Sequence, residues 1–156
     1  MSSYYCLVTS DTETKFARDI INSRLKEKKY PLYKKTPFLN EIKKNDEVVF
    51  YLAGKGENSQ SFVASAKILS IETIDNTAVI DPDNNNKIVL KYLNLDNINF
   101  FEKKINIKSI LDNLNFIKNK KHYGVTLVGG VSKIKYEDFK IINKWLDHTM
   151  LKCKYA

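Results

Sequence analysis

The sequence predicts an α+β fold in which a mainly antiparallel sheet curls into a small β-barrel with helices on its sides. The main reason is the order of segments: a strand and two helices are followed by several strands that only turns separate. This order differs from the regular alternation of strands and helices in parallel α/β folds. The length of 156 residues, with 43% hydrophobic and 12% aromatic residues, suits one core. We therefore expect residues 1–156 to form a single domain.

The N-terminal segment is expected to hold a strand and a helix. The run Tyr4–Thr9 is apolar and rich in β-favouring residues, which predicts a buried first strand. Apolar residues at helical spacing predict a helix from about residue 12 to residue 28. Ser10 or Asp11 can accept hydrogen bonds from the first free N–H groups of that helix.

The segment after this helix combines aromatic and basic residues. Tyr30–Lys35 is expected to be an irregular connector. Thr36 followed by Pro37 is a helix-start signal and predicts a short helix to about Ile42. Asn45 lies in a polar turn, where asparagine tolerates the left-handed backbone conformation.

Strands dominate the middle of the chain. The polar loop Gly54–Gln60 is expected to join two of them as a wide hairpin, because it lacks the spacing of a phosphate-binding loop and a strand follows it. Strands are expected at residues 47–53, 61–73, 78–80, 88–95 and about 97–104.

The C-terminal third is expected to be mixed. A basic loop occupies residues 114–124, and apolar residues at helical spacing predict a terminal helix that packs on the core. The other elements expected there are a short helix at 107–113, a last strand at 125–128 closed by Gly129 and Gly130, and the terminal helix at 136 to about 151.

Charge is distributed unevenly along the chain, whose formal net charge is +8. Residues 47–102 carry four Lys and Arg residues against eight Asp and Glu residues, whereas residues 103–156 carry twelve against four. Residues 1–46 are also basic, with ten against six. If the two basic flanks meet in space, they form a positive face that attracts phosphates. The alternative is a lysine-rich solubilising surface, since lysines outnumber arginines 24 to 2.

The composition also bears on location and cofactors. The chain has no apolar stretch of membrane-spanning length and starts without a secretory signal pattern, so we expect a cytoplasmic protein. Cys6 is expected in the core and Cys153 at the surface. The spacing of Cys and His residues suggests no metal site, and we expect no cofactor.

Catalytic residues are not expected. Asp46 and Glu47 lie next to each other on a strand and so point to opposite faces. Glu137 and Asp138 fall in the first turn of a helix, where the helix dipole stabilises acids. Neither pair is therefore predicted to act as a catalytic acid and base.

Six stretches of the sequence match, in order, the segments of one known family: Tyr4–Ser10, Tyr30–Ile42, Asn45–Tyr51, Ser61–Ala66, Leu114–Lys121 and Glu137–Ile142. Through them the sequence resembles the EVE domain family, a PUA-like family related to YTH domains. Asn45 stands where that family usually has glycine, and Ala64 replaces another usual glycine. Tyr5 and Tyr30 stand where the family often has tryptophan, which implies a looser aromatic cage.

The resemblance implies a PUA-like barrel with an aromatic pocket at its mouth. It further implies binding of DNA or RNA without catalysis, with a methylated cytosine or adenine held in the pocket. By position, the expected base-binding residues are Thr9, Ser10, Tyr30, Tyr33, Tyr51, Lys118 and Asn119. The expected phosphate contacts are Lys34, Lys35, Lys120 and Lys121.

Two other functions remain open at this point. The related ASCH domains include hydrolases of modified nucleosides, but their Gly-x-Lys-x-x-Glu-x-Arg stretch is not found in this sequence. The other alternative is a protein-interaction domain in which the lysines only keep the protein soluble.

Overall fold

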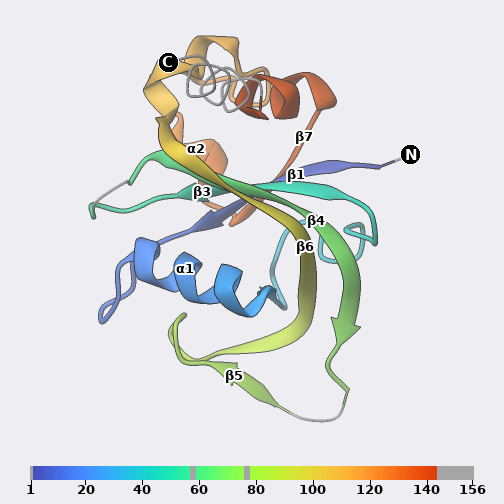
Figure 1. Cartoon of the computed structure of the whole chain (residues 1–156). Coiled ribbons are helices and arrows are strands. Elements are labelled where there is room, and N and C mark those ends of the chain that lie inside the picture. The colour runs from blue at the N-terminus through green and yellow to red at the C-terminus, as the bar shows by residue number, and fades with distance from the viewer. Residues whose placement is uncertain (1, 57–58, 76–77, 144–156) are drawn as a thin grey trace.

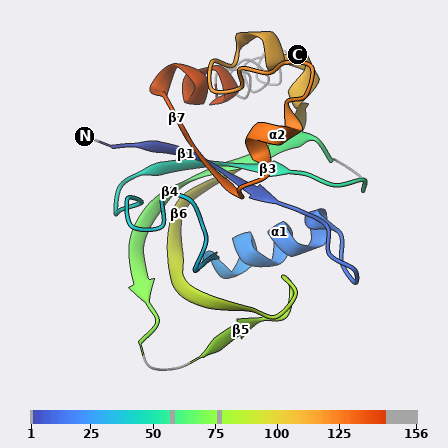
Figure 2. The same ribbon diagram turned by 180° about the vertical axis from the view of Figure 1, so that it is seen from behind.

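A computed structural model describes residues 2–56, 59–75 and 78–143. Within this part of the chain, seven strands form one sheet in the order β2-β6-β4-β3-β1-β7, and β5 pairs with β6 outside this path. Figures 1 and 2 show that the long strands β4 and β6 bend strongly, so the sheet curls into a half-barrel. The strands are β1 Tyr4–Thr9, β2 Lys29–Tyr33, β3 Glu47–Leu52, β4 Ser61–Thr73, β5 Val79–Asp81, β6 Lys87–Asn106 and β7 Val131–Ile134.

The helices lie on both sides of this curled sheet. Helix α1 crosses its concave side, and α2 lies on the other side together with the helix that begins at residue 136 (Figure 1). The helical elements are α1 Ala17–Glu27, the 3-10 turns η1 Ile107–Ser109 and η2 Leu111–Asn113, α2 Gly124–Leu127, and a helix from residue 136 that reaches the end of the described chain at residue 143.

The strand pairings are antiparallel except for β1 and β3, which run parallel with Tyr4 opposite Glu47. The sheet has two edge strands, β2 and β7, and these do not pair with each other. The barrel is therefore open between β2 and β7, and the residues that line this opening come from both edges.

Two hydrophobic cores cover the two faces of the sheet. Phe50 belongs to the core under α1, whereas its neighbour Tyr51 belongs to the second core with Phe62. Likewise, Leu7 belongs to the core under α1 and Cys6 to the second core, because successive side chains of a strand point to opposite faces. The prediction that Cys6 is a core residue is confirmed, since its side chain is 0% exposed.

Several expected elements are confirmed. The first strand and the strand at residues 61–73 have the expected limits, and the strand at residues 47–53 ends one residue earlier. Asn45 has a positive φ of 75°, as a left-handed turn requires. The fold class is also confirmed as a mixed, mostly antiparallel sheet that curls as a half-barrel with helices on its sides.

Two predictions for residues 12–35 were wrong. The first helix starts at Ala17 instead of residue 12, because Thr12 and Lys15 close a turn with two hydrogen bonds. Asp11 still accepts a hydrogen bond from the N–H of Ala17 over 2.8 Å, as expected for one of the two candidate acceptors. Only the expected first residue of the helix was wrong. The aromatic connector is strand β2, since its backbone pairs with β6.

The short helix expected from Pro37 to Ile42 is a series of turns. Phe38 has a φ of 61°, which is incompatible with a right-handed helix. The ring of Phe38 packs against Tyr5 at 5.9 Å between centroids, so tertiary packing prevails over the local helix signal.

Three further predictions in the second half were wrong. The strands expected at residues 88–95 and 97–104 form the single strand β6, which continues through Asn97 although its φ is 48°. The expected helix at 107–113 is two 3-10 turns. Residues 125–127 are helical in α2 and not a strand, and the last strand is β7, which begins after Gly129 and Gly130.

Some features lie outside this description. Trp145, Cys153 and the part of the terminal helix beyond residue 143 are outside the described residues. In the ranges that the structure does describe, no helix has both the length and the apolar character needed to cross a membrane.

Candidate functional site

A cavity of about 670 Å³ occupies the opening between the two edge strands. Its walls come from the end of β1, from β2, from the turn between β5 and β6, and from the chain around Gly129 and Gly130. Because these segments are distant in sequence, the cavity depends on the curling of the whole sheet. Its volume lies in the range of ordinary small-ligand pockets.

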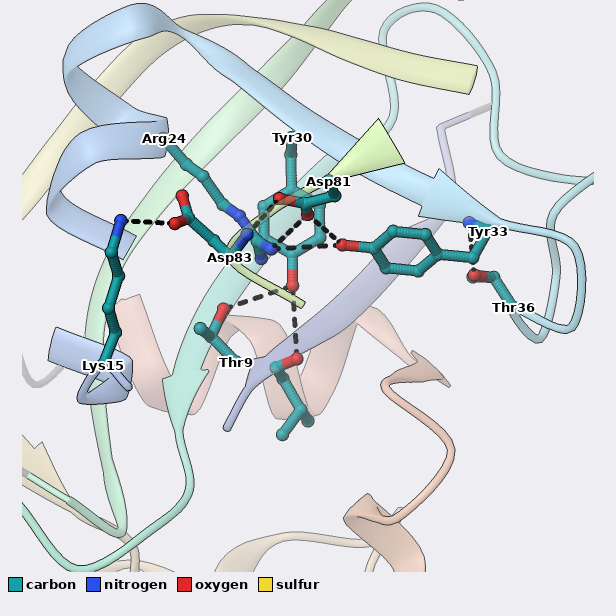
Figure 3. A network of polar contacts seen from close by, with 9 residues as sticks. Thr9, Lys15, Arg24, Tyr30, Tyr33, Thr36, Asp81 and Asp83 are labelled. Atoms are coloured by element: carbon teal, nitrogen blue, oxygen red, sulfur yellow. Dashed lines mark hydrogen bonds and ion pairs between the residues drawn. The ribbon is translucent and has the colours of Figure 1, made fainter. Parts of the chain in front are cut away.

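Tyr30 connects two walls of this cavity. Its hydroxyl donates to the backbone carbonyl of Val8 over 3.2 Å and lies 3.3 Å from the hydroxyl of Thr9. The guanidinium of Arg24 lies 4.9 Å from the centre of the Tyr30 ring (Figure 3). The side chain is buried, so Tyr30 serves as an aromatic wall and joins β2 to β1 across the open side of the barrel.

Tyr33 forms a second aromatic wall. Its hydroxyl donates to a carboxylate oxygen of Asp81 and accepts a hydrogen bond from Arg24 over 3.2 Å. Burial raises the pKa of Tyr33 above its ordinary value, so this hydroxyl keeps its proton and remains a donor. The ammonium group of Lys87 lies 5.6 Å from the ring centre. The ring is therefore fixed at its hydroxyl end and placed beside a cation.

An ion pair between Arg24 and Asp81 holds α1 against the β5–β6 turn. The guanidinium and carboxylate are 3.1 Å apart, and each side chain is 10% exposed. The other carboxylate oxygen of Asp81 accepts from the backbone N–H of Asp83 over 2.9 Å. Asp83 in turn forms an ion pair with Lys15 (Figure 3). This network fixes the position of the turn that closes one side of the cavity.

Sequence patterns predicted neither Arg24 nor Asp81 as a site residue, and the strand expected at residues 78–80 stops just short of Asp81. One signal was available, because an arginine at a buried helix position in a chain that otherwise uses lysine favours a paired, multi-donor role.

Six of the eleven expected site residues line this cavity: Thr9, Ser10, Tyr30, Tyr33, Lys34 and Lys35. Lys34 and Lys35 are exposed at its rim, and Ser10 is also exposed, whereas Thr9 is buried. Together these residues place aromatic rings inside the cavity and cations at its edge.

The other five residues lie elsewhere. Tyr51 points to the opposite face of the sheet and lines a second cavity of about 280 Å³. Its hydroxyl donates to the side chain of Gln60 over 2.8 Å, and burial raises its pKa. The second cavity adjoins the first, because Val8, Ser10, Val128 and Gly130 line both.

The four expected site residues of the late basic loop line neither cavity. Lys118, Asn119 and Lys121 are exposed in the segment that leads into α2. The ammonium group of Lys120 donates to the backbone carbonyl of Leu114, and the side chain of Asn119 accepts from the N–H of His122 over 3.0 Å. These residues thus shape the loop itself, and their expected contacts with a base or phosphate stay predictions.

The adjacent carboxylates have structural contacts. Asp46 is buried and accepts from the backbone N–H groups of Ser3 and Lys43, both over 2.9 Å. Asp138 is also buried and accepts from the N–H groups of Asn115 and Phe116, both over 2.8 Å. Asp138 therefore holds the start of the late basic loop as well as lying in the first turn of the terminal helix. Across residues 2–56, 59–75 and 78–143, no group of three or more His, Cys, Asp or Glu side chains is placed to hold a metal ion.

A model of the EVE domain family matches residues 4–145 of this sequence. The chain belongs to the EVE domain family. The order of its elements and its half-barrel sheet are those of a PUA-like EVE fold. No curated protein sequence gives a significant match.

Solved structures of similar fold cover almost the whole domain. A protein from Agrobacterium tumefaciens has a TM-score of 0.54 and 11% identity, with 93% of each chain covered. The human THYN1 protein, in complex with DNA that contains 5-methylcytosine, has a TM-score of 0.54 and 13% identity, with 93% of this chain and 98% of that chain covered. The Pho92 YTH domain in complex with m6A is less similar in fold, with a TM-score of 0.48 and 11% identity. The match covers 93% of this chain and 86% of that chain.

Proposed function

We propose that this EVE domain binds nucleic acid without catalysis and holds a methylated cytosine or adenine in the cavity between β2 and β7. The observation that carries the proposal is that Tyr30, Tyr33, Lys34 and Lys35 line one cavity. Residues of β1 and of the β5–β6 turn complete the walls of this cavity. Membership of the EVE family and the DNA-bound state of the similar THYN1 structure support it.

The cavity has the two features that such binding needs. Tyr33 provides aromatic surface against which a planar base can pack, and Tyr30, whose side chain is buried, forms part of the cavity wall. Lys34, Lys35 and Lys87 are exposed and line the cavity, where they can neutralise the phosphates on either side of that base. A base enters such a cavity only after it leaves the stack, so the ligand is either single-stranded or flipped from a duplex.

The direct test is a titration of the purified protein with labelled oligonucleotides. The set contains 5-methylcytosine DNA, m6A RNA and the unmodified strand of each sequence, measured by fluorescence anisotropy at low salt. We expect one modified strand to bind more tightly than its unmodified partner, and the affinity to fall steeply as salt rises. The strand should keep its mass after incubation, because the proposed role is binding. Equal or undetectable affinity for every strand would refute the proposal.

The rim lysines provide a test of the binding face. Lys34→Ala/Lys35→Ala should weaken binding of modified and unmodified strands alike and reduce the salt slope by about 2. The matched control is Lys44→Ala/Lys108→Ala, which removes the same charge from exposed lysines that line neither cavity. If the control weakens binding as much as the rim variant, general charge and not this face drives the interaction.

The cavity itself is tested by filling it. Ser10 is exposed and lines the cavity, so Ser10→Trp should occupy the space of the base. We expect this variant to lose the preference for the modified strand while keeping salt-dependent binding to both strands. Asn113→Trp adds the same ring at an exposed position that lines neither cavity and should leave the preference unchanged.

A further inference from the structure

Two valines, one on α2 and one directly after it, are the most exposed of the large hydrophobic side chains in the described part of the chain. Val125 is 71% exposed and Val128 is 82% exposed, whereas the others of this group range from 51% to 55%. Val128 continues the helical backbone of α2, so the two side chains are three positions apart and lie on the same face. Together they form one small apolar projection on the surface.

The position of these valines relates them to the proposed base-binding cavity. Val128 lines both cavities, so it stands at the rim where the two meet. The next two residues, Gly129 and Gly130, line the first cavity and let the chain pass close to it. A Cβ atom at Gly129 would come within 3.1 Å of the Pro37 ring, so this segment packs closely against the turns that follow β2.

The valines are carried on a rigid support. Leu127, between them in sequence, is buried in the second core and anchors α2 to the sheet. The carbonyl of Gly130 accepts from the N–H of Val8 over 2.8 Å, which joins this segment to β1. The hydroxyl of Ser132 donates to the carbonyl of Thr126 over 3.3 Å. The apolar pair is therefore held in place instead of being free to fold back onto the protein.

Basic side chains lie in the loop before these valines and around the cavity that Val128 lines. Lys118 and Lys121 are exposed in the loop that leads into α2, and Lys34 and Lys35 are exposed on the β2 side of the cavity. An apolar projection between cations matches the chemistry of a nucleic-acid duplex, whose stacked apolar bases lie between two rows of phosphates.

We propose that Val125 and Val128 form an apolar wedge that enters base-paired DNA beside the methylated base and fills its place in the stack when that base turns into the cavity. This inference rests on the proposed function and names duplex DNA as the ligand of the domain. Sequence-specific RNA recognition mostly uses single strands whose bases are already unstacked, and a wedge offers little advantage there. Apolar wedges that open base steps are an established means of distorting a duplex.

The test compares Val125→Ser/Val128→Ser with the unaltered protein on one sequence in two forms. The probes are a duplex with a single 5-methylcytosine and the corresponding single strand, each with 2-aminopurine next to the methylated base. For the duplex, we expect about tenfold weaker binding and loss of the fluorescence increase that reports unstacking. For the single strand, the affinity should change by less than about twofold, because its base is already accessible.

Two controls make the result specific. Leu69→Ser removes an exposed apolar side chain of β4 that lines neither cavity, and it should bind both probes as the unaltered protein does. A mismatch opposite the 5-methylcytosine lowers the cost of extruding it and should restore most of the duplex affinity of the valine variant.

The possible failures are distinguishable. If the unaltered protein binds no modified strand in either form, the proposed function itself fails. If it binds the single strand but not the duplex, the function stands and the wedge is overturned. The wedge is also overturned if the valine variant binds the duplex normally, or if it loses duplex and single strand to the same extent.

Discussion

The guanidinium of Arg24 on α1 lies 3.1 Å from the carboxylate of Asp81 at the end of β5, and each side chain is only 10% exposed. The two residues are 57 positions apart, so the pair exists only in the folded protein. Tyr33 hydrogen-bonds to both partners. This contact fixes helix, strand and turn around one wall of the cavity.

Breaking this pair should be costly for stability. Asp81→Asn leaves the Arg24 charge buried without its counter-charge, which we expect to lower the free energy of unfolding by about 3 kcal/mol. Urea denaturation measures the loss. The matched control is Glu72→Gln, because Glu72 pairs with Lys29 at the surface, where both side chains are 45% exposed. That variant should change the same free energy by less than about 0.5 kcal/mol. Equal losses in the two variants would show that the buried pair contributes no more than a surface one.

The buried carboxylate of Asp138 should control the order of the late basic loop. In Asp138→Asn the amide can accept only one of the two N–H groups of Asn115 and Phe116, so one remains unpaired. We expect the free energy of unfolding to fall by about 1 to 3 kcal/mol. Hydrogen exchange at these two amides should also become faster. Glu137→Gln, at the exposed neighbouring position, should leave both measurements unchanged, and a similar effect there would contradict this role of Asp138.

Alkaline pH should destabilise the fold through Cys6. Burial raises the pKa of its thiol from 9.0 to about 12, so the unfolded chain releases this proton at lower pH than the folded one. The stability from this group is complete below pH 9.0 and is lost as pH rises towards 12. Cys6→Ala cannot titrate. Between about pH 8 and about pH 10.5, the stability difference between the original protein and this variant should therefore shift by about 2 kcal/mol against the original.

Urea denaturation at the two pH values measures this difference. Comparison with the alanine variant matters because burial also raises the pKa values of Tyr33 and Tyr51, which destabilises both proteins at alkaline pH. A stability difference that stays constant with pH would mean that the Cys6 thiol ionises as readily in the folded chain as in the unfolded one.

Strand prediction succeeded where local pattern and tertiary environment agree. Tyr4–Thr9 and Ser61–Thr73 are apolar, β-favouring runs that lie inside the sheet, and both have the expected limits. Prediction failed where long-range contacts prevail over local signals. Pro37 and Phe38 follow a helix-start pattern, yet Phe38 takes a left-handed conformation and packs on Tyr5. Val125–Val128 has the composition of a strand, but only Leu127 is buried, as suits one face of a helical turn.

The same distinction separates the expected site residues that line the cavity from those that do not. Thr9, Ser10, Tyr30, Tyr33, Lys34 and Lys35 were chosen from two short segments, and each segment enters the cavity as a unit. Tyr51 could not be placed from local pattern alone, because alternation on β3 establishes that Phe50 and Tyr51 face opposite sides but not which side holds the cavity. Lys118 and Asn119 depend on the path of a loop whose position Asp138 fixes from the terminal helix.

The sequence by itself determined the α+β class, the main strands, the buried Cys6 and the resemblance to EVE domains, because these follow from side-chain periodicity and the order of segments. The tertiary structure alone decided where the cavity lies, how Arg24 and Asp81 meet beside it, and that Val125 and Val128 remain in water at its rim. The reason is physical: periodicity reports which face of an element is buried, whereas a cavity forms where elements distant in sequence fail to close against each other.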